Sequence, residues 1–289
     1  MSQSLADTLS SQPALDTLAA PLSDAVRGTF KKAGPAGAAV KNALHGVWLG
    51  HPLHPVFTDI PIGAWTAALA LDAKEAQSGD RAYGRAADFA LGVGLLGALG
   101  AAVTGLNDWS ETDGQPRRLG LLHGLLNISA TACVATAYAL RRSGERGPGR
   151  GLAALGYGIA IASSYLGGSL VYHDRIGVTH AVVNEPEAFT AVLDSDALAE
   201  GTMRKVTIEE ASFLLVRQHG KVCALAHSCA HLAGPLSEGE LKDGSVVCPW
   251  HGSEFSLADG HVINGPATQP QPCFEVRESN GRIELRAAR

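Results

Sequence analysis

The 289-residue sequence has few cysteines, little excess charge and no flavin- or nicotinamide-binding motif. Its five cysteines lack the spacing of a disulfide framework, so a secreted, disulfide-held fold is not expected. A formal net charge of −5 at pH 7 argues against nucleic acid as a partner. Residues 1–20 lack the basic and apolar regions of a secretory signal, and we expect no such signal. Any redox activity therefore needs a donor supplied by another protein or by a small reductant.

Two short motifs near the C-terminus carry recognisable chemistry. Cys229 and His231 form C-x-H, and after sixteen intervening residues Cys248 and His251 form C-x-x-H. These side chains could bind a structural zinc ion, but zinc fingers group Cys with Cys and His with His. Here each motif supplies one Cys and one His. This pairing fits a Rieske-type [2Fe–2S] cluster, in which two thiolates bind one iron and two imidazoles bind the other.

The surrounding residues resemble Rieske ferredoxins and the ferredoxin-like domains of Rieske oxygenases, over about residues 187–289. The similarity includes Val247–Ser253 and Gly265–Ala267 as well as the four ligands. The resemblance implies that the two cysteines bind the inner iron and the two histidines bind the outer, more exposed iron. It also implies a set of residues next to the ligands, namely Gly234, Trp250, Gly252, Ser253 and Pro266. Gly234, Gly252 and Gly265 suit loops that approach the cluster closely, because glycine has no Cβ.

Some members of this family belong to respiratory complexes and are called the respiratory branch here. This chain differs from them at two places that bear on the redox potential of the cluster. That branch has a second Cys in each loop, and the extra pair forms a disulfide; here the matching residues are Gly234 and Trp250. It also has a Tyr two residues after the Ser that donates to a bridging sulfide, where this chain has Phe255. One fewer hydrogen-bond donor stabilises the reduced cluster less, so we expect a potential near the low end of the Rieske range.

Residues 46–180 are markedly apolar. Ala86–Leu106 contains a single charge, and Leu119–Leu140 and Gly151–Tyr172 contain none, which suits helices that cross a bilayer. Pro55–Leu71 is a weaker candidate, because it is short and contains an aspartate and an internal proline. We expect four transmembrane helices rather than a soluble bundle. The expected fold class is α+β, with a four-helix transmembrane bundle followed by an all-β antiparallel domain.

The same half resembles a family of uncharacterised small membrane domains. The similarity lies in the HPLHP motif at residues 51–55, in Thr104–Asp108 and in Gly167–Tyr172. The resemblance implies a membrane location, and it brings no settled chemistry with it.

The histidines of this half fall at one face of the expected bundle. With four crossings, the first and third helices begin on the face where the second and fourth end. His51 and His54 open the first helix, His123 lies early in the third, and His173 follows the fourth. Ionisable groups at membrane depth are costly and often functional. Haem b held by these imidazoles, a quinone pocket, a bound metal ion, and interfacial histidines without a ligand all remain open.

The remaining segments complete the domain division into residues 1–45, 46–180 and 181–289. Residues 1–45 suggest a weakly ordered, solvated or membrane-surface segment, with a short amphipathic helix conceivable near residues 15–30. The acidic stretch 184–201 links the two domains and is expected to supply the first edge strand. Beyond it, short alternating stretches separated by Gly or Asp turns predict a small antiparallel sandwich or partly open barrel.

These features favour a membrane-anchored electron carrier that exchanges single electrons with a protein donor or acceptor, such as a reductase or an oxygenase. There are two alternatives: the protein is a component of a Rieske-type oxygenase or oxidoreductase system, or it is a redox sensor with a passive membrane anchor. About forty residues follow His251 and contain one further histidine, which gives no room for an oxygenase iron triad.

Lys and Arg are balanced on the two membrane faces, so the positive-inside rule does not decide the orientation. The unbridged loops and the expected free thiols of Cys133, Cys223 and Cys273 favour a cytoplasmic cluster.

Overall fold

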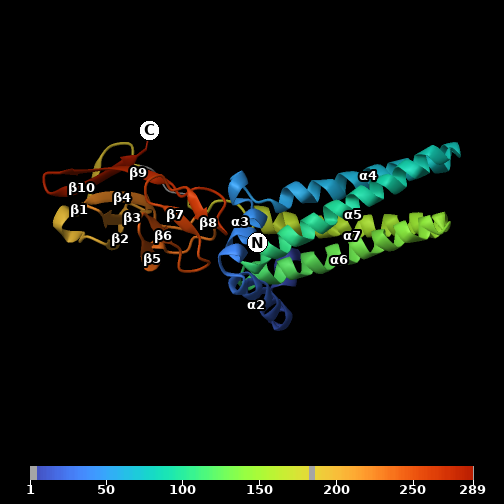
Figure 1. Cartoon of the computed structure of the whole chain (residues 1–289), viewed down its shortest axis with the longest axis horizontal. Helices are drawn as coiled ribbons and strands as arrows, with labels where there is room; N and C mark the ends of the chain where they lie inside the picture. Colours follow the sequence, from blue (N-terminus) through green and yellow to red (C-terminus); the bar gives the residue numbers. More distant parts are fainter. Residues whose placement is uncertain (1–4, 182–185, 289) are drawn as a thin grey trace. The chain divides into compact units, whose positions relative to one another are not determined.

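The computed structural model describes residues 5–181 and 186–288, which form two compact units, each with its own apolar core (Figure 1). The helical unit contains the described residues up to Gly37 together with Leu53–Asp174. The β unit contains Ala38–Pro52 together with the described residues from Arg175 onward. The chain is thus α+β, as the sequence predicts.

Four long helices run side by side in the helical unit (Figure 1). They are α4 (His54–Ser78), α5 (Arg81–Ser110), α6 (Gly114–Arg142) and α7 (Arg146–Tyr172). The closest packing is within two hairpins, α4 on α5 and α6 on α7. The expected bundle of four helices is present, but only α5, α6 and α7 are long and apolar enough to cross a membrane. The second half of α4 is more polar, because it carries Asp72, Lys74 and Glu75.

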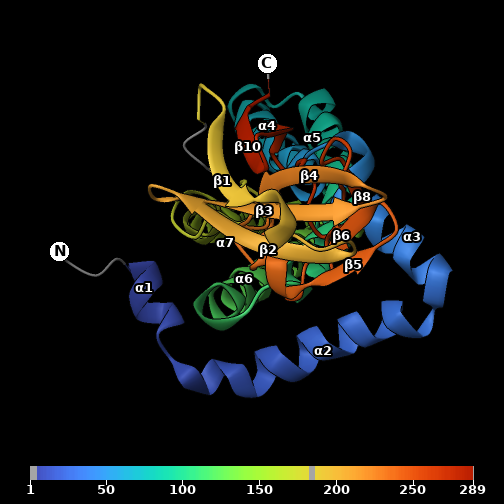
Figure 2. The same cartoon turned by 90° about the vertical axis from the view of Figure 1, so that its left-hand side faces the viewer.

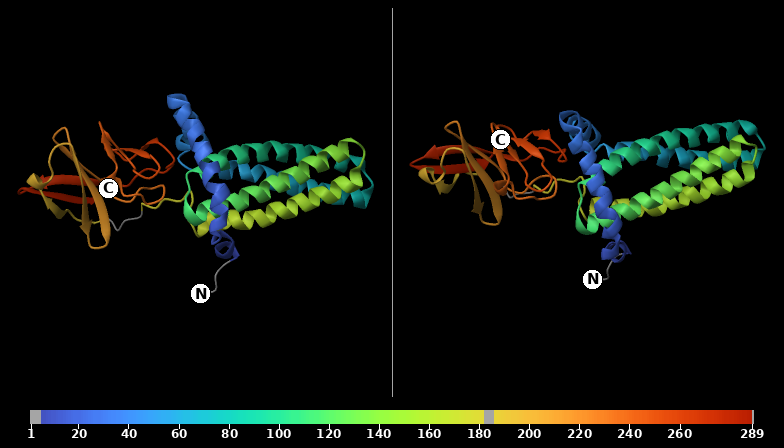
Figure 3. Two further views of the ribbon diagram at one scale, coloured as in Figure 1. Left: turned by 90° about the horizontal axis from the view of Figure 1, so that it is seen from below. Right: turned by 60° about the horizontal axis from the view of Figure 1, so that its bottom comes forward.

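The N-terminal region is helical, which corrects the expectation of a weakly ordered segment. It contains α1 (Leu5–Ser10), η1 (Pro13–Leu15), α2 (Asp16–Lys32), α3 (Gly34–His45) and η2 (Val47–Leu49). Figure 3 shows α2 lying across one end of the four long helices. Two kinds of contact hold α2 in place. Ala19 and Ser23 are fully buried, and Asp16 Oδ1 accepts a hydrogen bond from Arg117 of α6 at 3.1 Å. The small, polar composition of this segment hides these tertiary contacts from a sequence analysis.

The two hairpins of the bundle repeat the same burial pattern. Adding 69 to a residue number in α4 gives its counterpart in α6, and four of the five buried positions of α4 then coincide with buried positions of α6. The coinciding pairs are Pro61 and Ala130, Trp65 and Val134, Ala68 and Ala137, and Asp72 and Arg141. An offset of 62 relates α5 to α7 in the same way, with Ala87 and Gly149, Leu91 and Ala153, Gly94 and Gly156, Ala101 and Ser163, and Thr104 and Leu166 as pairs. The helical unit is therefore an internal tandem repeat of a two-helix hairpin.

A buried ionic network joins all four helices near one end of the bundle. The Arg141 guanidinium donates to Asp72 Oδ1 at 3.0 Å and to Asp88 Oδ1 at 3.2 Å. Arg146 joins Asp88 at 2.7 Å and Glu75 at 3.1 Å, and Arg150 also bonds to Glu75. Three carboxylates face three guanidiniums, so each buried charge has a partner of opposite sign. Such groups are tolerated at low dielectric only when they are paired in this way.

The described residues of the β unit form ten strands in two antiparallel sheets. A six-stranded sheet has the order β1-β10-β9-β4-β3-β2, and a four-stranded sheet has the order β5-β6-β7-β8 (Figure 2). The strands are β1 (Thr190–Asp194), β2 (Thr202–Ile208), β3 (Ala211–Gln218), β4 (Lys221–Ala226), β5 (Glu240–Lys242), β6 (Ser245–Val247), β7 (Glu254–Ser256), β8 (Val262–Asn264), β9 (Cys273–Ser279) and β10 (Arg282–Ala287). Short 3₁₀ turns, η3 (Ser195–Ala197) and η4 (Leu236–Glu238), interrupt the connections.

The expected edge strand is confirmed, because β1 lies at one end of the larger sheet. Residues 184 and 185 of the acidic linker lie outside the described residues. The sequence analysis did not find β5, which has only three residues and only one apolar side chain. The core between the sheets contains Phe213, Leu225 and Phe255, each fully buried.

The ionic network generates a test of how the bundle is stabilised. We expect Arg141→Ala to lower the free energy of unfolding by about 3–5 kcal/mol, because Asp72 and Asp88 would then lose a shared buried counter-charge. Thermal unfolding of the detergent-solubilised protein measures this effect. Arg142→Ala removes the same charge from the neighbouring, exposed residue and should change stability by about 0.5 kcal/mol at most. Equal losses in the two variants would contradict a stabilising role for the network.

Candidate metal centre

The two cluster loops of the β unit are two copies of one backbone turn. The N–H of Cys229 donates to Gly234 O at 2.9 Å, and the N–H of Ala233 donates back to Cys229 O at 2.9 Å. In the second loop, Cys248 N donates to Ser253 O at 2.8 Å, and Gly252 N donates to Cys248 O at 3.1 Å. The fifth residue of each turn has positive φ, +62° at Ala233 and +76° at Gly252. Each motif cysteine therefore occupies the same place in the same turn.

The two cysteine sulfurs lie together, and backbone N–H groups point at them. The thiols of Cys229 and Cys248 share a hydrogen bond. That bond lowers the pKa of Cys248 to about 7, and the backbone N–H groups of Trp250 and His251 act in the same direction. The shared bond and burial raise the pKa of Cys229. Backbone donors aimed at sulfur favour the thiolate, which is the form that binds metal.

The two imidazoles also lie together. The ring centroids of His231 and His251 are 5.0 Å apart, and the ring planes are inclined at 85°. His231 Nδ1 is buried and has no hydrogen-bond partner in the protein. Burial lowers the pKa of His231 well below its usual value, and positive charge on His251, His45, His180 and Lys41 acts in the same direction. A buried, neutral imidazole nitrogen with its lone pair available is suited to bind a metal.

This arrangement fits a two-iron cluster better than a single zinc ion. Within residues 5–181 and 186–288, no three His, Cys, Asp or Glu side chains converge as a mononuclear metal site requires. The four ligands instead form a sulfur pair and a nitrogen pair. Two thiolates on one iron and two imidazoles on the other require that separation. The assignment of Cys229, His231, Cys248 and His251 as ligands stays a prediction, and these two pairs are the arrangement that it requires.

The small residues predicted beside the ligands have three different roles. A Cβ on Gly234 would lie 2.6 Å from Cys248 Sγ and 3.2 Å from the Trp250 ring, so this position needs glycine for close approach. Gly252 has open space around it, and it is needed for its positive φ instead. At Gly265 the close neighbours are His45 and Val47 of the segment before α4. Trp250 is 57% exposed and covers the loop where the respiratory branch has its disulfide.

Ser253 follows the second motif and ends its turn, since its carbonyl accepts from Cys248 N. Its side chain is fully buried, and its Oγ accepts a hydrogen bond from Ala267 N at 3.0 Å. A hydroxyl that accepts one bond still has its own proton to donate. Pro266, joined to Gly265 by a cis peptide bond, immediately precedes Ala267. Phe255 is fully buried in the core and brings no hydroxyl to this region.

Gln271 supports the first loop and was missed by the sequence analysis. Its buried amide nitrogen donates to Ala226 O and Ser228 O, both at 2.7 Å, and its Oε1 accepts from Ala230 N at 2.9 Å. His180 adds a backbone hydrogen bond to Ala230 O at 3.0 Å. The only sequence signal was a glutamine between two prolines, which has no specific meaning.

Three histidines of the β unit, His219, His227 and His261, and the three cysteines outside the two motifs are not predicted ligands. His219 and His261 are exposed and pair with Asp243 and Asp259. His227 is only 7% exposed, and its Nε2 lies 2.8 Å from Ser237 Oγ. Cys133, Cys223 and Cys273 are free thiols, as expected. Burial raises the pKa of Cys223, and it raises that of Cys273 to about 11, so both thiols are poor nucleophiles.

In the helical unit, His54 and His123 occupy equivalent places in the two hairpins. Nδ1 of His54 lies 2.9 Å from Ala101 O, and Nδ1 of His123 lies 2.9 Å from Ser163 O. Because a carbonyl only accepts, Nδ1 carries the proton in each ring. Each ring also packs against a glycine four residues further along the partner helix, Gly105 or Gly167. The two rings interact electrostatically.

The other predicted membrane histidines do not join this pair. His51 belongs to the β unit, is exposed, and contacts Pro52 O at 3.1 Å. The His173 side chain is 71% exposed at the end of α7 and pairs with Asp174 at 3.0 Å. His123 has a second partner, since Asn127 Nδ2 lies 3.0 Å from its Nε2.

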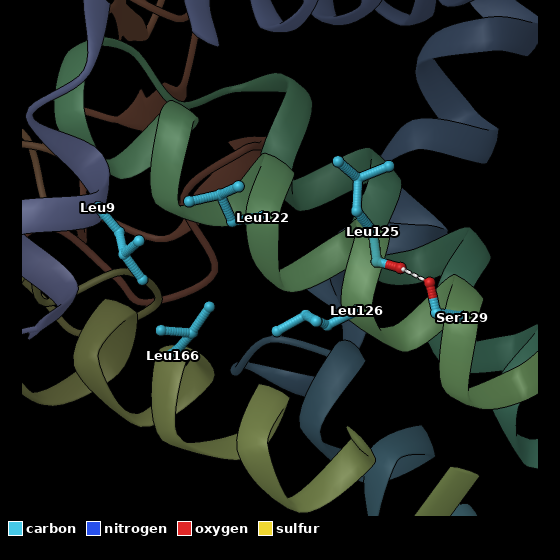
Figure 4. A pocket seen from close by; sticks show the side chains of 6 residues that line it. All are labelled: Leu9, Leu122, Leu125, Leu126, Ser129 and Leu166. Carbon is cyan, nitrogen blue, oxygen red and sulfur yellow. Dashed lines mark hydrogen bonds between the residues drawn. The ribbon is translucent and has the colours of Figure 1, made fainter. Parts of the chain in front are cut away.

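An apolar cleft lies beside His123 in the helical unit. It has a volume of about 300 Å³ and is lined by Leu9 of α1, by Leu166 of α7, and by Leu122, Leu125, Leu126 and Ser129 of α6 (Figure 4). Leu122 and Leu126 flank His123 on the α6 surface, one residue before it and three after it. The cleft is suited to a hydrocarbon chain, because five of its six lining side chains are leucines.

Two family descriptions match separate parts of the chain. Residues 188–275 match the Rieske [2Fe-2S] domain, and residues 50–180 match a family described as Predicted membrane protein (DUF2231). The first match contains the four ligands, and the second contains the four long helices and begins just before the HPLHP motif. The segment 1–49 lies outside both.

Curated relatives match the Rieske part. Apoptosis-inducing factor 3 of Mus musculus is 35% identical over 92 residues, which are 32% of this chain and 15% of that protein; the Homo sapiens protein is covered over 19% of its length. The ferredoxin component of the naphthalene 1,2-dioxygenase system of Pseudomonas putida is 31% identical over 33% of this chain and 90% of its own. Ferredoxin CarAc of Metapseudomonas resinovorans is 34% identical over 29% of this chain and 78% of its own.

Solved structures give a similar match. A complex of reduced oxygenase and oxidised ferredoxin in carbazole 1,9a-dioxygenase has a chain that is 27% identical, with 35% of this chain and 94% of that chain covered and a TM-score of 0.33. With sequence identity across nearly the whole of a known ferredoxin, and with paired sulfur and nitrogen ligands on matching turns, the chain belongs to the Rieske [2Fe-2S] family and joins this domain to one of the DUF2231 predicted membrane family.

Proposed function

We propose that the protein is a membrane-anchored electron carrier whose β unit exchanges single electrons with a redox partner. The observation that carries this proposal is the pairing of the ligands, two thiols on one side and two imidazoles on the other, at the tip of two matching loops. When bound, the [2Fe–2S] cluster supplies a site that accepts and releases one electron at a time.

The chain's own residues hold and tune that site. Backbone N–H groups that follow each cysteine stabilise thiolate charge, and Ser253 brings a buried hydroxyl beside the second loop. Gln271 holds the first loop by three hydrogen bonds, and Gly234 lets the two loops approach by leaving room for Cys248 Sγ. These contacts reduce the movement needed when the charge of the site changes, which is the protein's contribution to electron transfer.

A protein is the expected partner. Among the relatives, the Pseudomonas putida ferredoxin is a component of a dioxygenase system, and by this likeness we propose a reductase as donor and an oxygenase or other oxidoreductase as acceptor. Trp250, 57% exposed beside His251, offers an apolar contact surface at the loop tip. Aromatic side chains in such positions are common anchors of protein interfaces. A redox sensor with a passive anchor is the alternative, and failure to turn over with any reductase would favour it.

We further propose that α5, α6 and α7 cross the cell membrane with α4 packed beside them, and that the β unit faces the cytoplasm. The helices have the required length and hydropathy. All five cysteines are free, and Gly234 and Trp250 stand where a disulfide would close the loops, which suits a reducing compartment. Exposed leucines on α2, such as Leu18 and Leu22, suit contact with lipid at the membrane surface.

A second redox group in the membrane domain, haem b or a quinone, is a separate proposal. Its support is the equivalent placement of His54 and His123, each with Nδ1 held by a backbone carbonyl so that Nε2 is the unprotonated nitrogen. This second contact is a common feature of histidines that bind metals. A quinol, the reduced form of a quinone, could donate a hydroxyl hydrogen bond to such an Nε2, and the nearby leucine cleft suits its hydrocarbon tail. Because Asn127 already contacts His123 Nε2, either ligand would have to displace that amide.

The three hydrogen bonds of Gln271 predict that cluster binding depends on this side chain. We expect Gln271→Leu to lower the iron content per protein, because Ala226 O, Ser228 O and Ala230 N would lose their buried partners. Iron and sulfide assays with visible absorption measure the change. Gln218→Leu also removes two hydrogen bonds, but at an exposed site, and should retain full iron content. A Gln271→Leu protein with normal iron would contradict the supporting role.

The hydrogen-bond donors available around the second loop predict the redox potential of the cluster. We expect a midpoint near the low end of the Rieske range, roughly −150 mV, because Phe255 lacks the hydroxyl found in the respiratory branch. Phe255→Tyr should raise the midpoint and Ser253→Ala should lower it, since the two changes add and remove a donor. A redox titration monitored by electron paramagnetic resonance gives all three values. A wild-type midpoint well above zero would contradict the argument from missing donors.

The paired membrane histidines predict the optical spectrum. If a haem is bound, the dithionite-reduced minus oxidised spectrum of iron-replete protein contains sharp haem bands in addition to the broad bleaching of the iron–sulfur cluster. We expect His54→Ala and His123→Ala each to remove those bands, because the two rings are equivalent. His173→Ala is the matched control and should leave the spectrum unchanged, since that ring is exposed and pairs with Asp174. Bleaching of the cluster alone in the wild type would rule out haem and leave the quinone to binding assays.

A further inference from the structure

The segment before the first long helix belongs to the β unit and contacts the cluster region. Residues 38–52 group with the β unit by their contacts. Within this segment, Asn42 Oδ1 accepts from Gly265 N at 2.9 Å, and Asn42 Nδ2 donates to Asn264 Oδ1 at 2.9 Å. The loop that Asn42 holds continues to Ala267, whose N–H donates to the Ser253 hydroxyl. One side chain of α3 is thus two hydrogen bonds away from a residue beside the cluster.

Packing reinforces this contact. His45 is only 2% exposed, and a Cβ on Gly265 would lie 3.3 Å from His45 Cδ2 and 3.2 Å from Val47 Cγ2. At these distances a Cβ at position 265 would require His45 and Val47 to shift by a few tenths of an ångström. Gly265 therefore serves the close approach of α3, and not only that of the cluster.

Charge forms a third link between α3 and the site. Lys41 is adjacent to Asn42, which bonds to Gly265, and it lies one helical turn before His45, which packs on Gly265. In that position its positive charge acts on His231. Lys41 and His45 are four residues apart in α3, and Asn42 lies three residues before His45, so the three side chains share one face of the helix. The face that packs on the β unit is therefore also the face that brings a lysine charge near the outer ligand.

The Rieske family match begins at residue 188, so residues 38–52 lie outside it. We propose that α3 is a built-in part of the cluster site: Asn42 positions the Asn264–Ala267 loop, and Lys41 raises the midpoint potential by placing a positive charge near His231. Reduction adds one negative charge to the site, and a nearby cation stabilises the reduced form by Coulomb attraction. The inference rests on the proposed function, because it requires a Rieske cluster in the β unit.

The test compares charge-removing variants of the full-length, detergent-solubilised protein. Lys41→Gln should lower the midpoint potential in a titration monitored by electron paramagnetic resonance. Lys221→Gln is the matched control, since it removes an exposed lysine at the end of β4 that is remote from Cys229, and it should keep the wild-type midpoint. Equal midpoints in wild type and Lys41→Gln would overturn the role of the charge.

Asn42→Ala tests the positioning role with a separate measurement. The loss of both Asn42 hydrogen bonds should shift the g values or broaden the signal of the reduced cluster, while the iron content stays normal. Unchanged g values and linewidths would overturn positioning by Asn42. If Asn42→Ala fails to fold, Asn42→Asp keeps the acceptor for Gly265 N and removes the donor to Asn264, so a smaller change is expected.

The wild-type spectrum separates this inference from the proposed function. No Rieske signal in iron-replete wild-type protein would overturn both. A normal wild-type signal with unaltered midpoints and g values in the α3 variants would overturn only the role of α3 and leave the electron carrier intact.

Discussion

The cluster site depends on one backbone constraint, the hydrogen-bonded turn that begins at each motif cysteine. Its two closing bonds, from Cys229 N to Gly234 O and from Ala233 N to Cys229 O, recur at Cys248 with Ser253 and Gly252. The turn directs the next backbone N–H groups at the sulfur. Two copies of this turn bring the two thiols together and the two imidazoles together.

Supports converge on the first loop and on the loop that ends at Ala267. Gln271 and the backbone of His180 bond to the first loop, and Asn42 bonds to Gly265 two residues before Ala267. These supports come from parts of the sequence more than 200 residues apart. Their common effect is to restrict the loops before any metal binds, so that less ordering entropy is lost on binding.

The sequence was sufficient for features that depend on local spacing and hydropathy. The four ligands, the apolar helices α5 to α7 and most strands of the β unit follow from short motifs and periodicity. Features that depend on distant contacts could not be found in this way. Asn42 is an ordinary helix residue and Gln271 an ordinary polar one until the fold brings them to the loops. Similarly, α2 is weakly apolar in sequence, and its order comes from Asp16 meeting Arg117 and from buried Ala19 and Ser23.

The tandem repeat explains why the helical unit closes within one chain. His54 and His123 are equivalent and interact with each other, and so do Asp72 and Arg141, which places both pairs near the axis that relates the hairpins. The first pair consists of two identical residues, whereas Asp72 and Arg141 carry opposite charges. Two copies of the first hairpin would bring two buried aspartates together, and two copies of the second would bring two buried arginines together. Like charges at low dielectric repel strongly. The charge difference at this one pair therefore favours assembly of the two unlike hairpins over association of like ones, while the histidines keep the symmetric contacts.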